Sequence, residues 1–171
     1  MKKKGKKLVS ICLATIMAST ATVAAYAATN GWQRDGNNQW STWSYYENGV
    51  KKKGWLYQNN KWYYLDNKGN METGWDYING YKYYFDWNSG AMLTGWQFLG
   101  NYWYYFAENS SKQPIGSMFS NGWYWINNKC YYFNNDGEMA VNTTIGEYRV
   151  DASGAWIHGD FSDNLKSSKY G

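Results

Sequence analysis

The sequence predicts an all-β protein, a β-solenoid made of tandem β-hairpin repeats of about 20 residues. Three observations support this fold class. The dipeptide Gly-Trp returns five times, an aromatic triplet follows four of these dipeptides, and residues that favour tight turns lie between the two marks. Aromatic residues make up 21% of the chain, whereas its mean hydropathy is −0.74. The apolar area must therefore come from rings distributed along the chain, as many small stacked cores.

Residues 1–27 are expected to be a signal peptide and not part of the fold. Five lysines come first, an apolar run of small residues follows, and Ala25-Tyr26-Ala27 places small residues where a signal peptidase needs them. The alternatives are a buried helix or a retained membrane anchor. Hydroxyl residues such as Ser10 and Thr15 interrupt the apolar run, which disfavours a spanning helix. We therefore expect cleavage after Ala27 and no membrane span in the mature chain.

Removing this leader changes the charge of the protein. The mature part keeps 12 of the 17 basic residues and all 13 acidic residues, so its net charge is −1 in place of +4. The only mature lysine cluster is Lys51–Lys53, which is typical of a solvated edge, so no nucleic-acid partner is expected. Cys12 belongs to the leader, and Cys130 is left as the sole mature cysteine. No intrachain disulfide, metal or cofactor is expected.

The repeat has three marks in a fixed order. The first mark is Gly31-Trp32, Gly54-Trp55, Gly74-Trp75, Gly95-Trp96 and Gly122-Trp123, at intervals of 23, 20, 21 and 27 residues. The aromatic runs are residues 62–65, 83–85, 103–106 and 131–133. A glycine turn with methionine closes each unit, at 69–71, 90–92, 116–118 and 137–139. A pattern with three marks per unit predicts one supersecondary structure repeated along the chain.

Each unit is expected to be a β-hairpin. Residues that tolerate a positive φ separate the first two marks, at Asn59-Asn60, Asn79-Gly80, Gly100-Asn101 and Asn127-Asn128. Successive side chains of a strand face opposite ways, so Trp62 and Tyr64 share one face and Tyr63 takes the other. A single hairpin is marginal in water, and the repeats must stack.

The repeat domain is expected to span residues 28–160. Both ends are irregular, at 40–46 and 141–156, and an insertion at 110–115 lengthens one loop. Residues 161–171 are polar and small, and we expect a flexible tail there.

The three marks together resemble the choline-binding repeats of Gram-positive surface proteins and autolysins, over about residues 31–157. The same hairpin occurs in the carbohydrate-binding repeats of large clostridial toxins and in streptococcal glucan-binding repeats, and residues 75–85 are similar to the toxin type. The resemblance implies a secreted cell-wall-binding module of a Gram-positive bacterium. Its implied partner is choline or phosphocholine on teichoic or lipoteichoic acid.

The resemblance also implies where choline binds, in aromatic cages between consecutive hairpins. A quaternary ammonium donates no hydrogen bond and suits aromatic faces, and a thioether can close such a cage. The implied sites are Trp55, Trp62, Tyr84 and Met71, and then Trp96, Trp103, Tyr132 and Met118.

Three further interfaces depart from the pattern. Lys82 stands where the intervening repeat should have tryptophan, so Trp75, Lys82 and Tyr105 are expected to form no choline site. Cys130 replaces the same tryptophan in the last regular repeat, which weakens the site of Trp123. At the start, Trp32, Trp43 and Tyr64 are expected to form a partial cage, because their spacing is irregular. The weaker ligand-binding candidates are therefore Trp32, Trp43, Tyr64, Trp75, Tyr105 and Trp123.

Two other function classes stay open. A carbohydrate-binding module would use a flat ring flanked by asparagines, and a purely structural repeat would use every ring as core. An enzyme is not expected, because His158 is the only histidine and no nucleophile, metal or phosphate motif is present. End-to-end pairing through the terminal hairpins, as a homodimer, is also left open.

Overall fold

The computed structural model describes residues 30–36 and 42–157, and these residues form thirteen β-strands and no helix. The predicted signal peptide and flexible tail lie outside the described residues. The strands are β1 Gly31–Asp35, β2 Thr42–Glu47, β3 Val50–Lys51, β4 Gly54–Gln58, β5 Lys61–Leu65, β6 Gly74–Ile78, β7 Tyr81–Phe85, β8 Gly95–Leu99, β9 Tyr102–Phe106, β10 Gly122–Ile126, β11 Lys129–Phe133, β12 Thr143–Ile145 and β13 Tyr148–Val150. Nothing in the described part has the helical length and apolarity needed to cross a membrane.

All strand pairing is antiparallel and local. β1, β2 and β3 form a three-stranded sheet, and the pairs β4–β5, β6–β7, β8–β9, β10–β11 and β12–β13 are separate two-stranded sheets. The predicted solenoid of tandem hairpins is thereby confirmed. The five joints between successive hairpins are called the first to fifth interfaces, from β1–β2 against β4–β5 to β10–β11 against β12–β13.

The hairpin turns have the geometry that their asparagines predict. In the β4–β5 turn, Asn59 and Asn60 have φ of 51° and 60°, and in the β10–β11 turn, Asn127 and Asn128 have φ of 49° and 64°. Two consecutive residues with positive φ match the right-handed twist of the flanking strands. The turn residues therefore fix the register in which the aromatic side chains meet.

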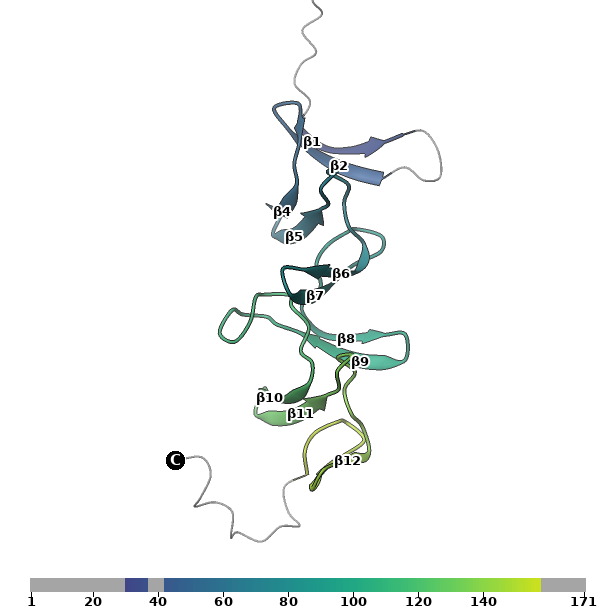
Figure 1. Cartoon of the computed structure of the whole chain (residues 1–171), viewed down its shortest axis with the longest axis vertical. Coiled ribbons are helices and arrows are strands. Elements are labelled where there is room, and N and C mark those ends of the chain that lie inside the picture. Colours follow the sequence, from purple (N-terminus) through teal and green to yellow (C-terminus); the bar gives the residue numbers. More distant parts are fainter. Residues whose placement is uncertain (1–29, 37–41, 158–171) are drawn as a thin grey trace, which may run out of the picture.

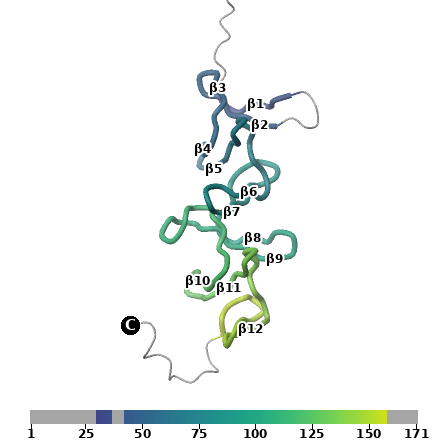
Figure 2. The backbone as a smooth tube through the Cα atoms, in the orientation of Figure 1, coloured from purple at the N-terminus to yellow at the C-terminus, as the bar shows by residue number. Residues whose placement is uncertain are grey.

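The hairpins stack along one axis and change direction from one to the next (Figure 1). β4–β5 and β10–β11 point to one side, whereas β1–β2 and β8–β9 point to the other. The same direction thus returns every third hairpin, and the backbone trace follows this staircase (Figure 2). The result is an elongated molecule whose core is divided among the interfaces.

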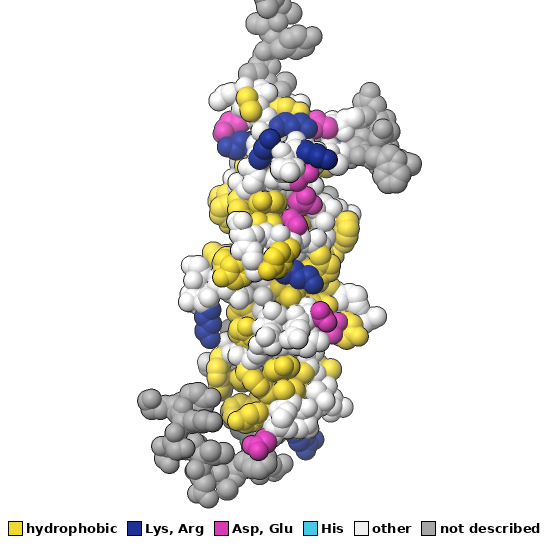
Figure 3. Space-filling view, viewed as in Figure 1, with side chains coloured by type: hydrophobic (Ala, Val, Ile, Leu, Met, Phe, Trp, Pro, Cys, Tyr) yellow, Lys and Arg dark blue, Asp and Glu magenta, His cyan; other side chains and the backbone are white. Residues whose placement is uncertain are grey.

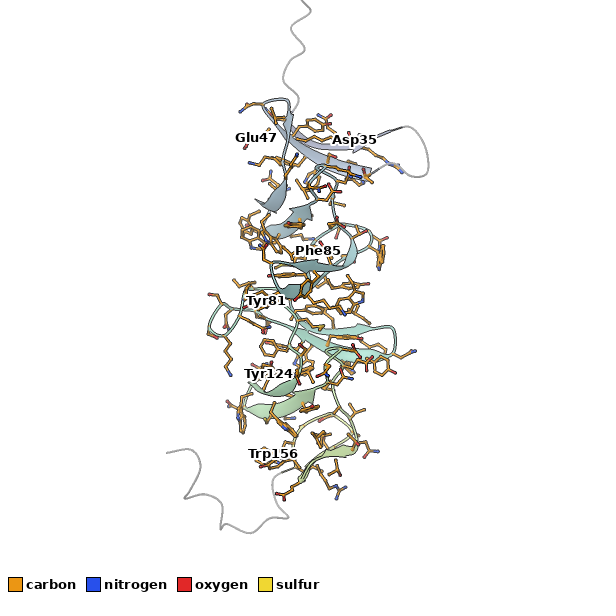
Figure 4. The ribbon with its side chains drawn as sticks, in the orientation of Figure 1. Asp35, Glu47, Tyr81, Phe85, Tyr124 and Trp156 are labelled. Carbon is orange, nitrogen blue, oxygen red and sulfur yellow. The ribbon has the colours of Figure 1, made fainter. Side chains whose placement is uncertain are left out.

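Each interface has a small core at the end of the second strand of a hairpin. Leu65, Phe85, Phe106 and Phe133 are fully buried there, and Phe85 is labelled in Figure 4. Each of the four forms an isolated bridge with the methionine that follows it in the closing turn. These residues have no exposed surface left for a ligand, so their role is structural.

The glycine of each closing turn is needed for two reasons. Gly90 has a φ of 70°, and a Cβ at this position would collide with the thioether of Met71. Gly116 stands in the same relation to Met92, with a φ of 79°. The glycine and methionine of the repeat pattern therefore make one packing contact between neighbouring turns.

Candidate functional site

The register of β4–β5 gathers aromatic rings on one face of the hairpin. Trp55 pairs with Tyr64 and Tyr57 pairs with Trp62, so all four point the same way. The Trp55 and Trp62 ring centroids are 6.2 Å apart, and their planes make an angle of 89°. Two perpendicular indoles form the walls of an open corner.

The next hairpin contributes a third wall to this second interface. The Tyr83 ring lies 4.9 Å from the Trp55 ring, at 68° to it. The N–H of Met92 donates a hydrogen bond of 2.8 Å to the carbonyl oxygen of Trp62, which places Met92 at the same corner. Trp62 remains 39% exposed, so the corner is open to solvent.

The fourth interface repeats this arrangement. The Trp96 ring lies 6.4 Å from Trp103 at 84°, and 4.7 Å from Tyr131 at 69°. Met139 donates its N–H to the Trp103 carbonyl oxygen over 2.8 Å. A cavity of about 420 Å³ lies here, lined by Trp96, Trp103, Tyr131, Met139 and Ser153. Ser153 is the only lining residue that is neither aromatic nor apolar, and none of the five lining side chains is charged.

At the two corners, the third ring is not the predicted tyrosine but the tyrosine that precedes it in the sequence. Tyr84 lies against Trp75 of its own hairpin, 4.9 Å away, and Tyr132 lies against Trp123, 5.3 Å away. Tyr83 and Tyr131 take the expected places at the second and fourth interfaces. The reason is the period of two in a strand: each hairpin turns one face forward and the other backward, and Tyr83 is on the backward face.

Met71 and Met118, which were predicted at the second and fourth interfaces, each lie one interface earlier in the stack. The N–H of Met71 donates to the Trp43 carbonyl oxygen over 2.7 Å, and that of Met118 donates to the Lys82 carbonyl oxygen over 2.8 Å. Met71 therefore closes the first interface and Met118 the third. The closing turn follows the second strand of one hairpin and reaches back to the hairpin before it, which puts Met92 and Met139 at the two-tryptophan corners.

The third interface keeps the stacking rings and lacks the second indole. The Trp75 ring lies 5.1 Å from Tyr104 at 66°, much as Trp96 lies against Tyr131. The Nζ atom of Lys82 lies 4.4 Å from the Trp75 ring centroid. A lysine ammonium at this distance makes a cation–π contact, so the chain's own cation lies beside the ring.

Tyr105 was predicted to belong to this third interface, and the structure places it elsewhere. Its ring contacts Trp96 at 5.1 Å and Phe119 at 5.1 Å, and its hydroxyl donates to Glu108 over 2.5 Å. Burial, and then the bond to Glu108, raises the pKa of Tyr105 to about 12. Tyr105 is therefore a core residue under the insertion, and Tyr104 faces Trp75.

The first interface has a similar stacked pair. Trp32 lies 4.9 Å from Tyr63 at 64°, and Trp43 is 43% exposed beside the Met71 bond. Tyr64, the predicted partner, lies against Trp55 instead, 5.1 Å away. The tyrosine that reaches back to the preceding hairpin is thus the first of each Tyr-Tyr pair, at every interface where the pair occurs.

Several carboxylates of the described repeats, such as Asp86 and Asp151, are used by the turns. Asp86 accepts bonds from the N–H and hydroxyl of Ser89, and these bonds hold its pKa below the usual range. Asp151 does the same with Ser153, with the same effect on its pKa. Within residues 30–36 and 42–157, no group of three His, Cys, Asp or Glu side chains could hold a metal ion.

Hydrophobic side chains gather in separate patches along the molecule (Figure 3). This distribution and the ring geometry define a class of protein, a stacked-hairpin module that presents aromatic clusters between its repeats. Family models match three consecutive segments: a putative cell wall binding repeat at 53–71, and choline-binding repeats at 72–117 and 117–156. Together they run through more than half of the chain. The chain belongs to the family of choline-binding, cell-wall-binding repeat proteins.

Solved structures from Streptococcus pneumoniae show the same family. The choline binding domain of Spr1274 is 34% identical, covering 62% of this chain and 95% of that one, with a TM-score of 0.25. Choline binding protein F is 35% identical, with 75% and 48% covered and a TM-score of 0.46. CbpJ is 38% identical, with 75% and 48% covered and a TM-score of 0.41. The chain thus spans about half the length of these last two proteins. No curated protein sequence matches it significantly.

Proposed function

We propose that the chain is a secreted, non-catalytic module that binds choline groups of teichoic or lipoteichoic acid on a Gram-positive cell wall. The observation that carries this proposal is the repeated corner at the second and fourth interfaces. Trp55, Trp62 and Tyr83 make one corner, and Trp96, Trp103 and Tyr131 make the other. Membership of the family supports the choice of ligand and of location.

The corner suits a cation that is surrounded by methyl groups. A trimethylammonium group needs no hydrogen-bond partner, and each aromatic face attracts it by about 0.5–2 kcal/mol through cation–π interaction. Met139 lines the fourth cavity and offers a soft apolar contact without a competing charge. An unmethylated ammonium would lose most of its water and find few acceptors among the rings, so the walls favour a quaternary cation.

Two sites on one rigid stack favour a polymer over a single small molecule. Each site alone is expected to bind weakly, because only a few contacts hold a small cation. A polymer that carries choline at many positions can occupy both sites, and the second binding event is then intramolecular. Wall attachment through avidity is the role that we infer.

The non-catalytic part of the proposal rests on how the acidic residues are used. Turn carboxylates such as Asp66, Asp86 and Asp151 accept backbone N–H groups of their own turns. Glycoside hydrolysis would need two carboxylates facing each other across a cleft. The cavity of the fourth interface has no carboxylate in its lining.

A carbohydrate ligand is the second candidate, and single exposed rings favour it. Tyr77 and Trp87 are 71% and 66% exposed, and each offers a flat face outside the corners. A sugar ring stacks on such a face and bonds to nearby polar groups. This candidate differs from the first in its ring requirement, which is one platform in place of three walls.

Calorimetric and tryptophan-fluorescence titrations of the purified protein test the proposal. We expect saturable choline binding, and we expect Trp55→Ala and Trp96→Ala each to remove one equivalent. Trp87→Ala is the matched control, since it removes an exposed ring outside the interfaces. Binding of glucan or galactose-type oligosaccharides without a response to choline would move the protein to the carbohydrate class. Absence of binding to both choline and oligosaccharides would indicate a purely structural repeat protein.

A further inference from the structure

The fifth interface contains a ring cluster that the repeat pattern does not predict. Trp123 lies 5.7 Å from Tyr148 at 78°, and 6.4 Å from Trp156 at 58°. Tyr148 and Trp156 are 5.5 Å apart at 89°. Figure 4 labels Trp156 in this last part of the stack. Three rings in three different planes thus meet where the sequence pattern has lost one of its tryptophans.

We propose that the fifth interface is a further cage for a quaternary ammonium group, in which Trp156 supplies the wall that Cys130 does not. This inference rests on the proposed function, because it assumes the same ligand chemistry. It adds a site at the irregular end of the repeat, built from a different combination of residues.

The backbone shows that Trp156 stands in the place of the closing methionine. Its N–H donates to the Cys130 carbonyl oxygen over 2.8 Å, as the N–H of Met139 donates to the Trp103 carbonyl oxygen. It also forms the isolated bridge with Val150 that Met139 forms with Phe133. The second strand therefore carries Trp103 at the fourth interface and Cys130 at the fifth. The closing turn carries Met139 at the fourth interface and Trp156 at the fifth, so the large and the small residue have changed places.

The exchange of sizes explains how the Trp156 indole reaches the cage. Trp123 and Trp125 lie on the same face of β10–β11 as Cys130. The Trp156 ring lies 6.4 Å from the Trp123 ring and 6.5 Å from the Trp125 ring. It therefore covers the strand face on which Cys130 has only a small side chain. Cys130 is buried, with 6% of its surface exposed. A tryptophan at position 130 would compete with the Trp156 indole for this space.

The centroid distances resemble those of the two-tryptophan corners, whereas the Trp123 and Trp156 planes meet at 58° in place of the 84° between Trp96 and Trp103. At the fourth interface the central Trp96 has its two neighbours at 6.4 and 4.7 Å, and at the fifth the central Trp123 has its neighbours at 6.4 and 5.7 Å. Tyr148 is 46% exposed, which leaves the cluster accessible from solvent. The third interface differs from both, because Lys82 places an ammonium group against its central ring.

The experiment counts choline equivalents in variants of the full protein. We expect Trp156→Ala to lose one equivalent while the sites tested by Trp55→Ala and Trp96→Ala persist. Trp156→Met restores the usual residue and is expected to lose the same equivalent, since position 130 still has no ring. The double variant Cys130→Trp with Trp156→Met recreates the fourth interface, and we expect it to recover the equivalent. Thermal unfolding without ligand verifies that each variant folds.

Tyr148→Leu gives a second test that keeps an apolar side chain at the interface. It is expected to weaken the fifth site at least 10-fold and to leave the other sites unchanged. An unchanged number of equivalents in Trp156→Ala, with losses in Trp55→Ala and Trp96→Ala, would overturn this inference and keep the proposed function. Absence of choline binding in the parent protein would overturn both.

Discussion

The third and fourth interfaces have the same architecture and differ at one decisive residue. Trp75 stacks on Tyr104 as Trp96 stacks on Tyr131, with centroid distances of 5.1 and 4.7 Å. The second residue of the second strand is Lys82 at the third interface and Trp103 at the fourth, and it pairs with Tyr77 and Phe98, respectively. Ring stacking across the joint is therefore common to both, and only the second indole is optional. The comparison separates the rings that stack across the joint from the second indole, on which the proposed cage depends.

The position of Lys82 also shows why a missing ring is more than a missing contact. Its Nζ atom is 4.4 Å from the Trp75 centroid, within the range of a cation–π interaction. The ammonium is tethered to the chain, so it competes with any free cation for the same ring face and repels it. We therefore expect the third interface to bind no choline group.

The largest effect on choline affinity is expected when the fourth interface is converted into the third. Trp103→Lys removes an aromatic wall and introduces a repelling cation, which together should cost about 2–3 kcal/mol, or roughly a 30- to 150-fold weaker choline Kd. Calorimetry measures this change, with Trp103→Phe as the control that keeps an aromatic face. Equal affinity in the lysine and phenylalanine variants would show that the Lys82 ammonium is not what closes the third interface.

The reverse change is expected to create a site. Lys82→Trp places a second indole beside Trp75 and removes the tethered ammonium, and we expect one additional choline equivalent. Lys82→Met removes the charge without adding a ring and should bind far more weakly. The readout is the stoichiometry of the titration. A tryptophan variant with no additional equivalent would mean that Tyr104 and Met118 do not complete a cage.

The next effect concerns stability in place of ligand affinity, and it applies to the second to fifth interfaces, where the glycine of the closing turn meets a methionine thioether. Gly90→Ala forces a Cβ into the Met71 thioether and requires a side chain at a φ of 70°. Overpacking and backbone strain together should lower the free energy of unfolding by about 2–4 kcal/mol. Gly100→Ala is the matched control, because its φ is 61° and nothing lies near the added Cβ. Denaturant unfolding should show a smaller loss in the control, and equal losses would exclude the methionine contact as the cause.

The smallest expected effect is a dependence of stability on acidity in the first sheet. Asp35 accepts an ion pair from Lys51 and a 2.7 Å bond from the Ser44 hydroxyl, and these contacts hold its pKa below the usual value of 3.8. A lowered folded-state pKa stabilises the fold above pH 3.8, and this stability is lost as the pH falls through the folded-state pKa. Thermal unfolding between pH 5 and about pH 2 should show the loss, and Asp35→Asn should reduce it and leave the part that comes from Asp86 and Asp151.

The sequence was sufficient for the hairpins and insufficient for the way they face each other. Asparagine pairs and Gly-Trp dipeptides locate the turns and the first strands, because positive φ and period-two alternation are local properties. The choice between Tyr83 and Tyr84 depends on which face of β7 turns back toward Trp55. That choice is set by the rotation between hairpins, which no local pattern contains.

The backward reach of the methionines and the ring contacts of Trp156 were not predicted, for a related reason. Met71 and Met92 have the same place in the pattern, and only the backward reach of the closing turn assigns them to the first and second interfaces. Cys130 and Trp156 exchange roles across 26 residues, so reading each repeat by itself shows a defect at 130 and no compensation. A search for large residues at the methionine position would have found Trp156.

The hydrogen bond from each closing turn to the hairpin before it makes the molecule a one-dimensional series of joints. In such a series, a ligand at one joint strengthens two neighbouring hairpins and has little direct effect on distant ones. The joint at Lys82 already holds an ammonium group of the chain itself, whereas the proposed cages on either side of it would gain contacts from a bound choline group. We therefore expect the free module to open first at the second and fourth interfaces. A bound wall polymer should stabilise these two interfaces against mechanical force.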